Sequence, residues 1–162
     1  MLHIRKARME DLPELIRIEN QCFSKEEAAT EEAFKKRIQT ISDSFFVAER
    51  NDKIVGLVNG PVIETAVITD DLFTEIKINP SIGGHQSILG LAVAPQYQKQ
   101  GIATTLLAHL EKEAKEKIRQ SITLTCKENL ITFYEKHGYT NIGLSNSQHG
   151  GICWYNMIKE LY

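Results

Sequence analysis

The segment from Leu91 to Ala103 constrains this chain most, because it has the pattern of a strand, a tight loop and the start of a helix. An apolar run ends at Val93, a turn is expected around Pro95, and residues Gln98 to Ala103 open a stretch with helical periodicity. The first backbone N–H groups of a helix lack intrahelical partners, and the helix dipole adds partial positive charge there. The junction is therefore a suitable seat for a pyrophosphate.

Two small residues at this junction favour close approach of a ligand. Gly101 has no Cβ to obstruct it, and Ala103 keeps the following position small. The best-known nucleotide loops, GxGxxG and GxxxxGK[ST], do not occur in the chain. Since many α/β turns share the strand–glycine–helix pattern, the pattern alone does not identify the ligand.

Composition indicates one ordinary globular domain over residues 1–162, with 42% hydrophobic and 25% charged residues. The net charge of −2 predicts neither a nucleic-acid partner nor an anionic membrane. We expect a cytoplasmic protein, because the N-terminus lacks the apolar core of a signal peptide and no apolar run approaches the ~20 residues of a membrane span. Cys22, Cys126 and Cys153 are widely spaced, so we expect neither a disulfide scaffold nor a metal site.

The chain alternates strand-like and helix-like segments, which predicts a mixed α/β domain. The expected strands are Leu2–Ala7, Ser44–Arg50, Lys53–Val62, Ser87–Ala94, Ser121–Cys126, Tyr139–Leu144 and Ile152–Ile158, and the expected helices begin near Asp11, Thr30, Ile102 and Asn129. Residues 64–81 have no regular pattern and are expected to form a long functional loop. Gly90 interrupts an apolar strand, which indicates a bulge, a close backbone approach or a simple packing accommodation.

The sequence pattern Gln98-x-x-Gly101-x-Ala103 after Leu-Ala-Val resembles the acyl-CoA pyrophosphate motif of the GNAT superfamily of N-acetyltransferases. The chain is more closely similar to the arylalkylamine (serotonin) N-acetyltransferase-like branch. In that branch a Gly-Gly-His precedes the motif strand and a Phe-Tyr-Glu follows on the next helix, as Gly83–His85 and Phe133–Glu135 do here. The similarity extends roughly from Phe23 to the C-terminus.

The resemblance implies a central, mostly antiparallel mixed sheet of about seven strands flanked by about four helices and splayed at the motif strand. It implies acetyl-CoA as cosubstrate and a small primary amine, arylalkylamine-like or a polyamine, as acceptor, in a monomer or homodimer. Two alternatives stay open: a protein or peptide N-acetyltransferase, and a CoA-binding sensor without turnover.

The resemblance also implies where the cofactor lies. Pantetheine would pair with the motif strand, and one backbone N–H there would polarise the thioester carbonyl. The implied cofactor-binding residues are Leu91, Ala92, Val93, Gln98, Lys99, Gln100, Gly101, Ile102, Ala103, Thr104, Asn129 and Phe133. Asn129 either caps its helix or hydrogen-bonds the pantetheine.

Tyr134 is the expected acid. Its helical periodicity alone indicates a core tyrosine, but the matching tyrosine of the family protonates the departing thiolate. A phenol, with an ordinary pKa near 10, stays protonated at neutral pH and can serve as an acid.

The chain departs from the family pattern at the expected general base. The branch carries a His-x-His pair on the motif strand, and those positions are Ser87 and Leu89 here. His85 is the nearest imidazole and is either the proton acceptor or an exposed turn residue. A chain of waters reaching His85, Glu64 or Glu75 is a further alternative.

Two more groups could serve an acceptor site. An acidic run between the first two helices is either a solvated face or an attraction for a cationic amine, and consists of Glu26, Glu27, Glu31 and Glu32. Four phenylalanines are either core or apolar walls of the acceptor site: Phe23, Phe34, Phe45 and Phe46.

Overall fold

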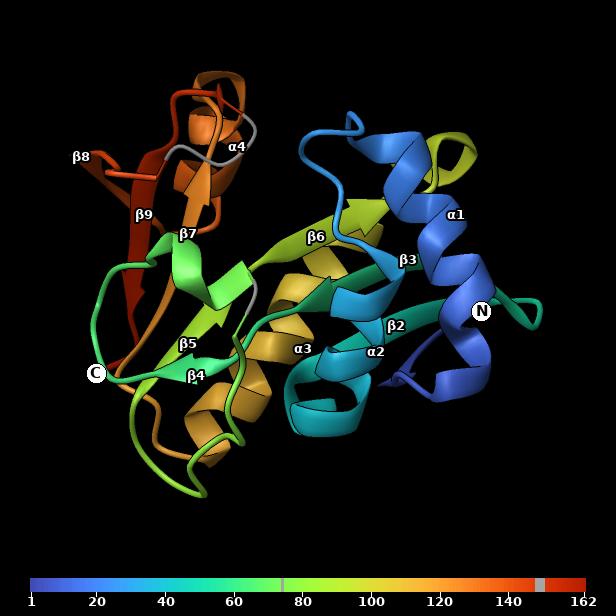
Figure 1. Cartoon of the computed structure of the whole chain (residues 1–162), viewed down its shortest axis with the longest axis horizontal. Coiled ribbons are helices and arrows are strands. Elements are labelled where there is room, and N and C mark those ends of the chain that lie inside the picture. Colours follow the sequence, from blue (N-terminus) through green and yellow to red (C-terminus); the bar gives the residue numbers. More distant parts are fainter. Residues whose placement is uncertain (74, 148–150) are drawn as a thin grey trace.

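The computed structural model describes residues 1–73, 75–147 and 151–162, and within them the chain forms nine strands and four α-helices (Figure 1). The strands are β1 (Leu2–Lys6), β2 (Phe45–Arg50), β3 (Lys53–Asn59), β4 (Val62–Ile63), β5 (His85–Ile88), β6 (Gly90–Val93), β7 (Ser121–Cys126), β8 (Thr140–Leu144) and β9 (Tyr155–Glu160). The helices are α1 (Leu12–Cys22), α2 (Glu31–Thr40), α3 (Ile102–Glu116) and α4 (Ile131–Lys136).

The strands form two sheets, in the orders β1-β2-β3-β6 and β4-β5-β7-β9-β8. Each neighbouring pair in the described residues is antiparallel except β5 and β7, which are parallel. β5 and β6 follow each other in the chain but belong to different sheets, so β6 and β7 diverge (Figure 1). The predicted mixed α/β fold with a splay at the motif strand is confirmed.

A β-bulge causes this divergence. The Leu89 N–H donates to the Asn59 carbonyl (2.8 Å), although the register pairs Asn59 with Gly90. Two residues of the motif strand therefore face one residue of β3, which bends the strand locally. Of the three explanations for Gly90 in the sequence, the bulge is the one that the hydrogen bonding supports.

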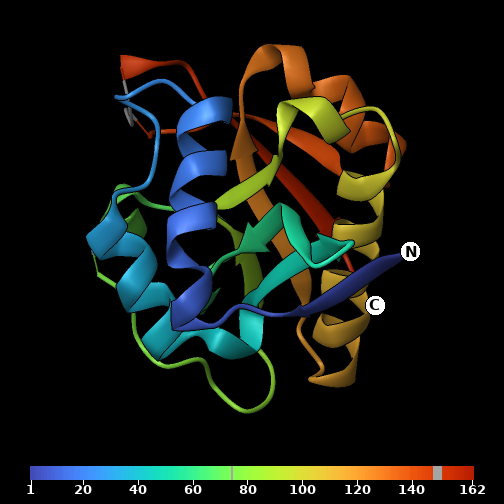
Figure 2. The same cartoon turned by 90° about the vertical axis from the view of Figure 1, so that its right-hand side faces the viewer.

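Helices cover both faces of the first sheet. α1 and α2 lie on one side of β1–β3, and α3 lies on the other (Figure 2). The apolar stripe of α3 is buried against the sheet and consists of Ile102, Leu106, Leu107, Leu110 and Ala114. Because the helix is fixed along its whole length by this stripe, its first turn is held at the divergent end of β6.

Four details differ from the sequence-based expectation. The predicted strand 87–94 is split at Leu89, and the short β4 is additional, so the strand count exceeds seven. The last strand begins at Tyr155 because residues 152–154 precede the ladder with β7. α4 begins at Ile131, after a 3₁₀ turn. The predicted loop packs against β7, where Thr123 Oγ1 donates to the Ala66 carbonyl (2.7 Å).

Candidate active site

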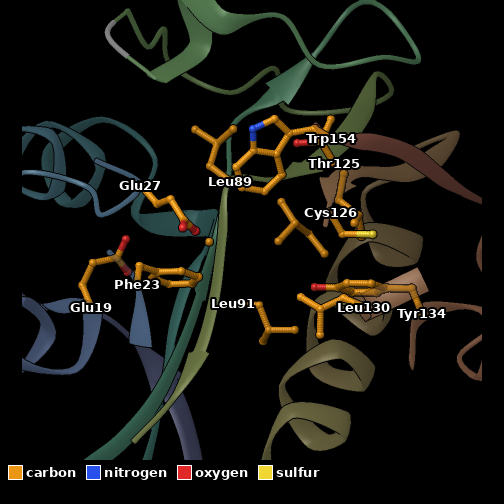
Figure 3. A pocket seen from close by; sticks show the side chains of 13 residues that line it. Glu19, Phe23, Glu27, Leu89, Leu91, Thr125, Cys126, Leu130, Tyr134 and Trp154 are labelled. Carbon is orange, nitrogen blue, oxygen red and sulfur yellow. The ribbon is translucent and has the colours of Figure 1, made fainter. Parts of the chain in front are cut away.

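Two cavities open on opposite sides of the gap between β6 and β7. The larger is a groove of about 690 Å³ between the start of α3 and α4, lined by Leu91, Ala92, Val93, Tyr97, Gln98, Lys99, Gly101, Ile102, Ala103, Thr104, Leu130, Phe133 and Tyr134. The smaller has a volume of about 80 Å³ and is lined by Glu19, Phe23, Glu27, Ile88, Leu89, Gly90, Leu91, Leu124, Thr125, Cys126, Leu130, Tyr134 and Trp154 (Figure 3). Leu91, Leu130 and Tyr134 line both, so the cavities meet at these side chains.

The backbone of β6 presents hydrogen-bonding groups to the gap. The Ala94 N–H donates to β3 (2.8 Å), and bonded pairs alternate along an antiparallel ladder. Leu91 and Val93 therefore direct their N–H and C=O groups away from β3. The Val93 carbonyl already accepts from Cys22 Sγ (3.2 Å) and Gln98 Nε2 (3.0 Å). The Leu91 N–H is thus a fixed donor beside the meeting point of the cavities.

The mouth of the groove is built from the start of α3. Gly101 has a φ of +81° and open space around its missing side chain, and Lys99 has a φ of +63°. The first bond along the helix is from the Thr105 N–H to the Gly101 carbonyl (3.0 Å). The N–H groups of residues 102–104 have no acceptor earlier in the helix, and they project toward its N-terminal end. This mouth suits an anion, as the sequence predicted.

Most of the predicted cofactor residues meet at the groove, and two do not. Gln100 is absent from the lining, and its Oε1 accepts from Arg50 Nη1 (2.6 Å). Asn129 lies at a separate surface depression with Lys127 and Cys153. Ala92 lines the groove, but its backbone pairs with β3 by the alternation described above.

Tyr134 lies between the two cavities. Its side chain is 6% exposed, and its hydroxyl points into the gap (Figure 3). The ring packs edge-on against Phe133 and Tyr139, with centroids 5.1 and 5.6 Å apart. Burial, assisted by the nearby Cys126 thiol group, raises the pKa of Tyr134 above that of an ordinary phenol. The hydroxyl is therefore a proton donor at neutral pH.

His85 lies away from both cavities. Its Nδ1 shares a hydrogen bond of 2.6 Å with Ser121 Oγ at the start of β7. Gly90 lies five positions further along the chain, which is roughly 16 Å in an extended strand. Ser87 is buried and donates to the Pro61 carbonyl (2.5 Å). The structure thus does not bring the predicted imidazole to the gap.

The exposed Glu64 and Glu75 also line neither cavity. A water chain from this gap to His85, Glu64 or Glu75 stays a prediction.

Two carboxylates line the smaller cavity on the side opposite Tyr134 (Figure 3). Glu27 accepts from Lys127 Nζ (2.8 Å) and from Ser24 Oγ (3.0 Å), and its side chain is 6% exposed. Glu19 is buried and accepts from the Ala29 N–H (2.8 Å). Acidic side chains at the wall of a small cavity favour a cationic occupant.

Of the acidic run predicted from the sequence, only Glu27 lines the cavity, and the others are exposed: Glu26, Glu31 and Glu32. Phe23 is an apolar wall of the cavity, whereas the other three phenylalanines are buried in the core: Phe34, Phe45 and Phe46.

Sequence analysis did not assign Glu19 or Trp154 to the site. Glu19 lies four residues after Leu15 on the apolar face of α1. An acidic residue on an otherwise apolar helix face is the sequence feature that could have indicated a functional role. Trp154 is the one tryptophan of the chain and comes just before β9. Neither signal indicates a cavity by itself.

Among the described residues, no three His, Cys, Asp or Glu side chains are grouped so that they could hold a metal ion. Also within those ranges, none of the helices is both long and apolar enough to cross a bilayer.

The Cys126 thiol lines the smaller cavity but is unsuited to nucleophilic attack. Burial raises the pKa of Cys126 to about 11, so at pH 8 about one thiol in a thousand is the reactive thiolate.

We predict that iodoacetamide modifies the exposed Cys153 at least about 100-fold faster than Cys126, with the Cys126 rate rising about tenfold per pH unit toward pH 11. Mass spectrometry of the native protein measures both rates, and the unfolded protein is the control. Equal native rates would contradict the assigned burial.

Comparisons with known proteins agree with this geometry. Residues 11–161 match the family model described as Acetyltransferase (GNAT) domain. An N-alpha-acetyltransferase of Saccharolobus solfataricus is 29% identical over 143 residues, covering 86% of this chain and 80% of that protein.

Among solved structures, the GphF GNAT-like decarboxylase in complex with isobutyryl-CoA has a TM-score of 0.83 at 19% identity and covers 99% of this chain and 100% of its own. The PaiA N-acetyltransferase of Thermoplasma acidophilum in complex with coenzyme A has a TM-score of 0.66 at 20% identity, covering 99% of each chain. At these identities the two structures show a shared fold. The family-model match over residues 11–161 and the archaeal relative show that this chain belongs to the GNAT family and is an N-acetyltransferase.

Proposed function

We propose that this chain transfers the acetyl group of acetyl-CoA to a primary amine by direct attack. The observation that carries the proposal is the pair of cavities that meet at Leu91 and Tyr134. The larger has a mouth rich in backbone N–H groups, as a pyrophosphate requires, and the smaller has a carboxylate wall, as a cationic amine requires.

The groove fits coenzyme A along its length. The N–H groups of residues 102–104, with Lys99 beside them, would hold the pyrophosphate. The outward Leu91 carbonyl and Val93 N–H would pair with the amides of pantetheine as a neighbouring strand does. The thioester would then lie where both cavities meet. The two solved relatives named above contain isobutyryl-CoA and coenzyme A, which supports this choice of cosubstrate.

The chemistry uses groups that the fold holds in place. The amine loses a proton and its nitrogen bonds to the acetyl carbon, while the carbon–sulfur bond breaks. The Leu91 N–H stabilises the developing oxyanion, and the Tyr134 hydroxyl supplies the proton that sulfur takes. Cys126 stays protonated, so no acetyl-cysteine intermediate is needed. Positioning two reactants on either side of one gap contributes much of the rate.

We assign proton acceptance to Glu27, directly or through one water. Glu27 is a carboxylate on the acceptor side of the gap, whereas His85 lines neither cavity. Glu19 lines the same wall and is the second carboxylate there. Glu27 therefore replaces the imidazole that the sequence suggested.

The acceptor is a primary amine of one of two kinds. The arylalkylamine-like motifs indicate a small aryl or polyamine acceptor, and the archaeal relative is an N-alpha-acetyltransferase, which indicates an α-amine. A cavity of about 80 Å³ holds the amine and only a few atoms around it. Both kinds of acceptor present such a group.

Release of free thiol from acetyl-CoA tests the proposal. The acceptors are 2-phenylethylamine, tryptamine, spermidine and a tripeptide with a free N-terminus, and the N-acetylated tripeptide is the control. We expect release with at least one free amine, none with the blocked peptide, and saturable coenzyme A binding by calorimetry. Binding without release from any amine would instead indicate a sensor, and absence of binding would remove the basis of the proposal.

Replacing Tyr134 with Phe tests the acid. The change removes one hydroxyl and keeps the ring packing, so we expect kcat to fall about 10²- to 10⁴-fold with little change in coenzyme A affinity. Tyr139→Phe is the matched control, because this buried neighbour lines neither cavity. An equal loss of kcat in both variants would show that Tyr134 acts through packing alone.

Replacing Glu27 with Gln tests the base. The amide keeps the shape but cannot accept a proton, so we expect kcat/KM for the amine to fall about 10²-fold or more while coenzyme A affinity stays constant. The adjacent exposed Glu26→Gln is the control. Raising the pH deprotonates the free amine and should recover part of the loss. A variant with unaltered kcat/KM would rule out this assignment.

A further inference from the structure

One lysine of the chain already holds its amine against the proposed base. Lys127 Nζ donates to Glu27 Oε1 (2.8 Å), although the two residues are 100 positions apart. Lys127 follows Cys126 at the end of β7, and Glu27 lies between α1 and α2. Cys126 and Glu27 stand on opposite sides of the smaller cavity (Figure 3), so this ion pair crosses the gap from the second sheet to the helices on the first.

The amine stands at the rim of the smaller cavity. Glu27 lines that cavity, and so do Thr125 and Cys126, the two residues before Lys127. Lys127 itself lines the surface depression that begins at its own position. Because the smaller cavity is only about 80 Å³, its carboxylate wall lies within a few ångströms of the place beside Leu91 where the thioester would lie. A short movement therefore brings Nζ to the acetyl carbon.

The lysine side chain is free to make this movement. Its exposed fraction is 38%, whereas that of Glu27 is 6%, so much of the lysine stem faces solvent. Within the described part of the chain, Glu27 is the one hydrogen-bond partner of Nζ, and a four-carbon stem has several rotatable bonds. Glu27 also accepts from Ser24 Oγ (3.0 Å), so the carboxylate stays in the cavity wall while the lysine moves.

On the basis of the proposed function, we propose that Lys127 is a site of self-acetylation, an acceptor that the chain itself supplies. Glu27 takes one proton from the ammonium, and the Nζ lone pair then bonds to the acetyl carbon of acetyl-CoA. The carbon–sulfur bond breaks, and the second proton that the nitrogen loses passes to sulfur through the Tyr134 hydroxyl. The products are an acetylated lysine, free coenzyme A and the proton on Glu27, so no further reagent is needed.

Lys35 provides a matched comparison inside the same protein. Its exposed fraction is 39%, and its Nζ is paired with Glu31 and Glu32 at 3.5 Å each. It lies on α2, and neither Lys35 nor its two partners line either cavity. Acetyl-CoA in solution can acetylate both lysines chemically, but of the two only Lys127 has the base and the acid of the site within reach. A difference in rate between them therefore measures catalysis and not exposure.

Incubation with acetyl-CoA in the absence of any acceptor tests the proposal, with occupancy at each lysine read by peptide mass spectrometry from the moment of purification. We expect Lys127 to be acetylated at least about tenfold faster than Lys35. Tyr134→Phe should slow acetylation of Lys127 about 10²-fold or more and leave the rate at Lys35 unchanged. Dilution of the protein should not alter the rate at Lys127, because the amine and the site belong to one chain.

Thiol release gives a second readout that leaves the proposed catalytic groups unchanged. Without acceptor, wild type should release free thiol in a single burst, and this burst and the Lys127 occupancy at purification should together amount to about one acetyl group per chain. Lys127→Arg keeps the positive charge, but a guanidinium does not lose its proton, so both the burst and the occupancy should be absent. Lys35→Arg is the matched control and should behave as wild type.

The outcomes separate this inference from the proposed function. Equal rates at Lys127 and Lys35, or an unaltered Lys127 rate in Tyr134→Phe, would mean chemical acetylation and would overturn the inference, while thiol release with free amines would still support the proposed function. If no free amine releases thiol and Lys127 reacts no faster than Lys35, the proposed function itself fails. If Tyr134→Phe does not fold, Lys127→Arg decides, because an undiminished burst in that variant also overturns the inference.

Discussion

The site depends on one irregular pairing, the bulge in which Leu89 and Gly90 together face Asn59. The bulge allows consecutive stretches of one strand to join different sheets, β5 with β7 and β6 with β3. Without it, β6 would continue beside β7 and their backbone groups would bond to each other. The splay instead leaves the Leu91 N–H directed into a gap, where a ligand with its own amides can take the place of a strand.

The two sides of this gap carry opposite electrostatic character. On one side, the α3 amides and Lys99 offer positive charge and partial charge to an anion. On the other, Glu19 and Glu27 offer carboxylates to a cation. Each substrate is therefore favoured in one cavity, and the cavities meet only beside Tyr134 and two leucines. The fold thus sets the direction from which each reactant approaches.

Sequence predicted those parts of the site that are local in the chain. The groove mouth follows from consecutive residues, because Lys99 to Thr104 form one turn and its helix start, and the stripe that ends at Ala114 fixes that helix. His85 was selected by its closeness in sequence to the motif strand, but each strand residue adds about 3.3 Å, so a short count becomes a long distance. Glu27 and Trp154 approach the gap from segments far apart in the chain, which no local spacing reveals.

The buried Arg37–Asn59 pair is the clearest case of a feature that only the fold reveals. Its members lie 22 residues apart, and each alone has the pattern of an ordinary helix or strand residue. Removing a guanidinium from water is costly, and stability alone would favour an apolar pair of similar volume. The pair places the amide nitrogen beside Gly90, a strand position without a side chain. The same glycine thus lies in the bulge that opens the gap and beside the buried amide, so the splay of the sheet and the packing of this pair depend on a single residue.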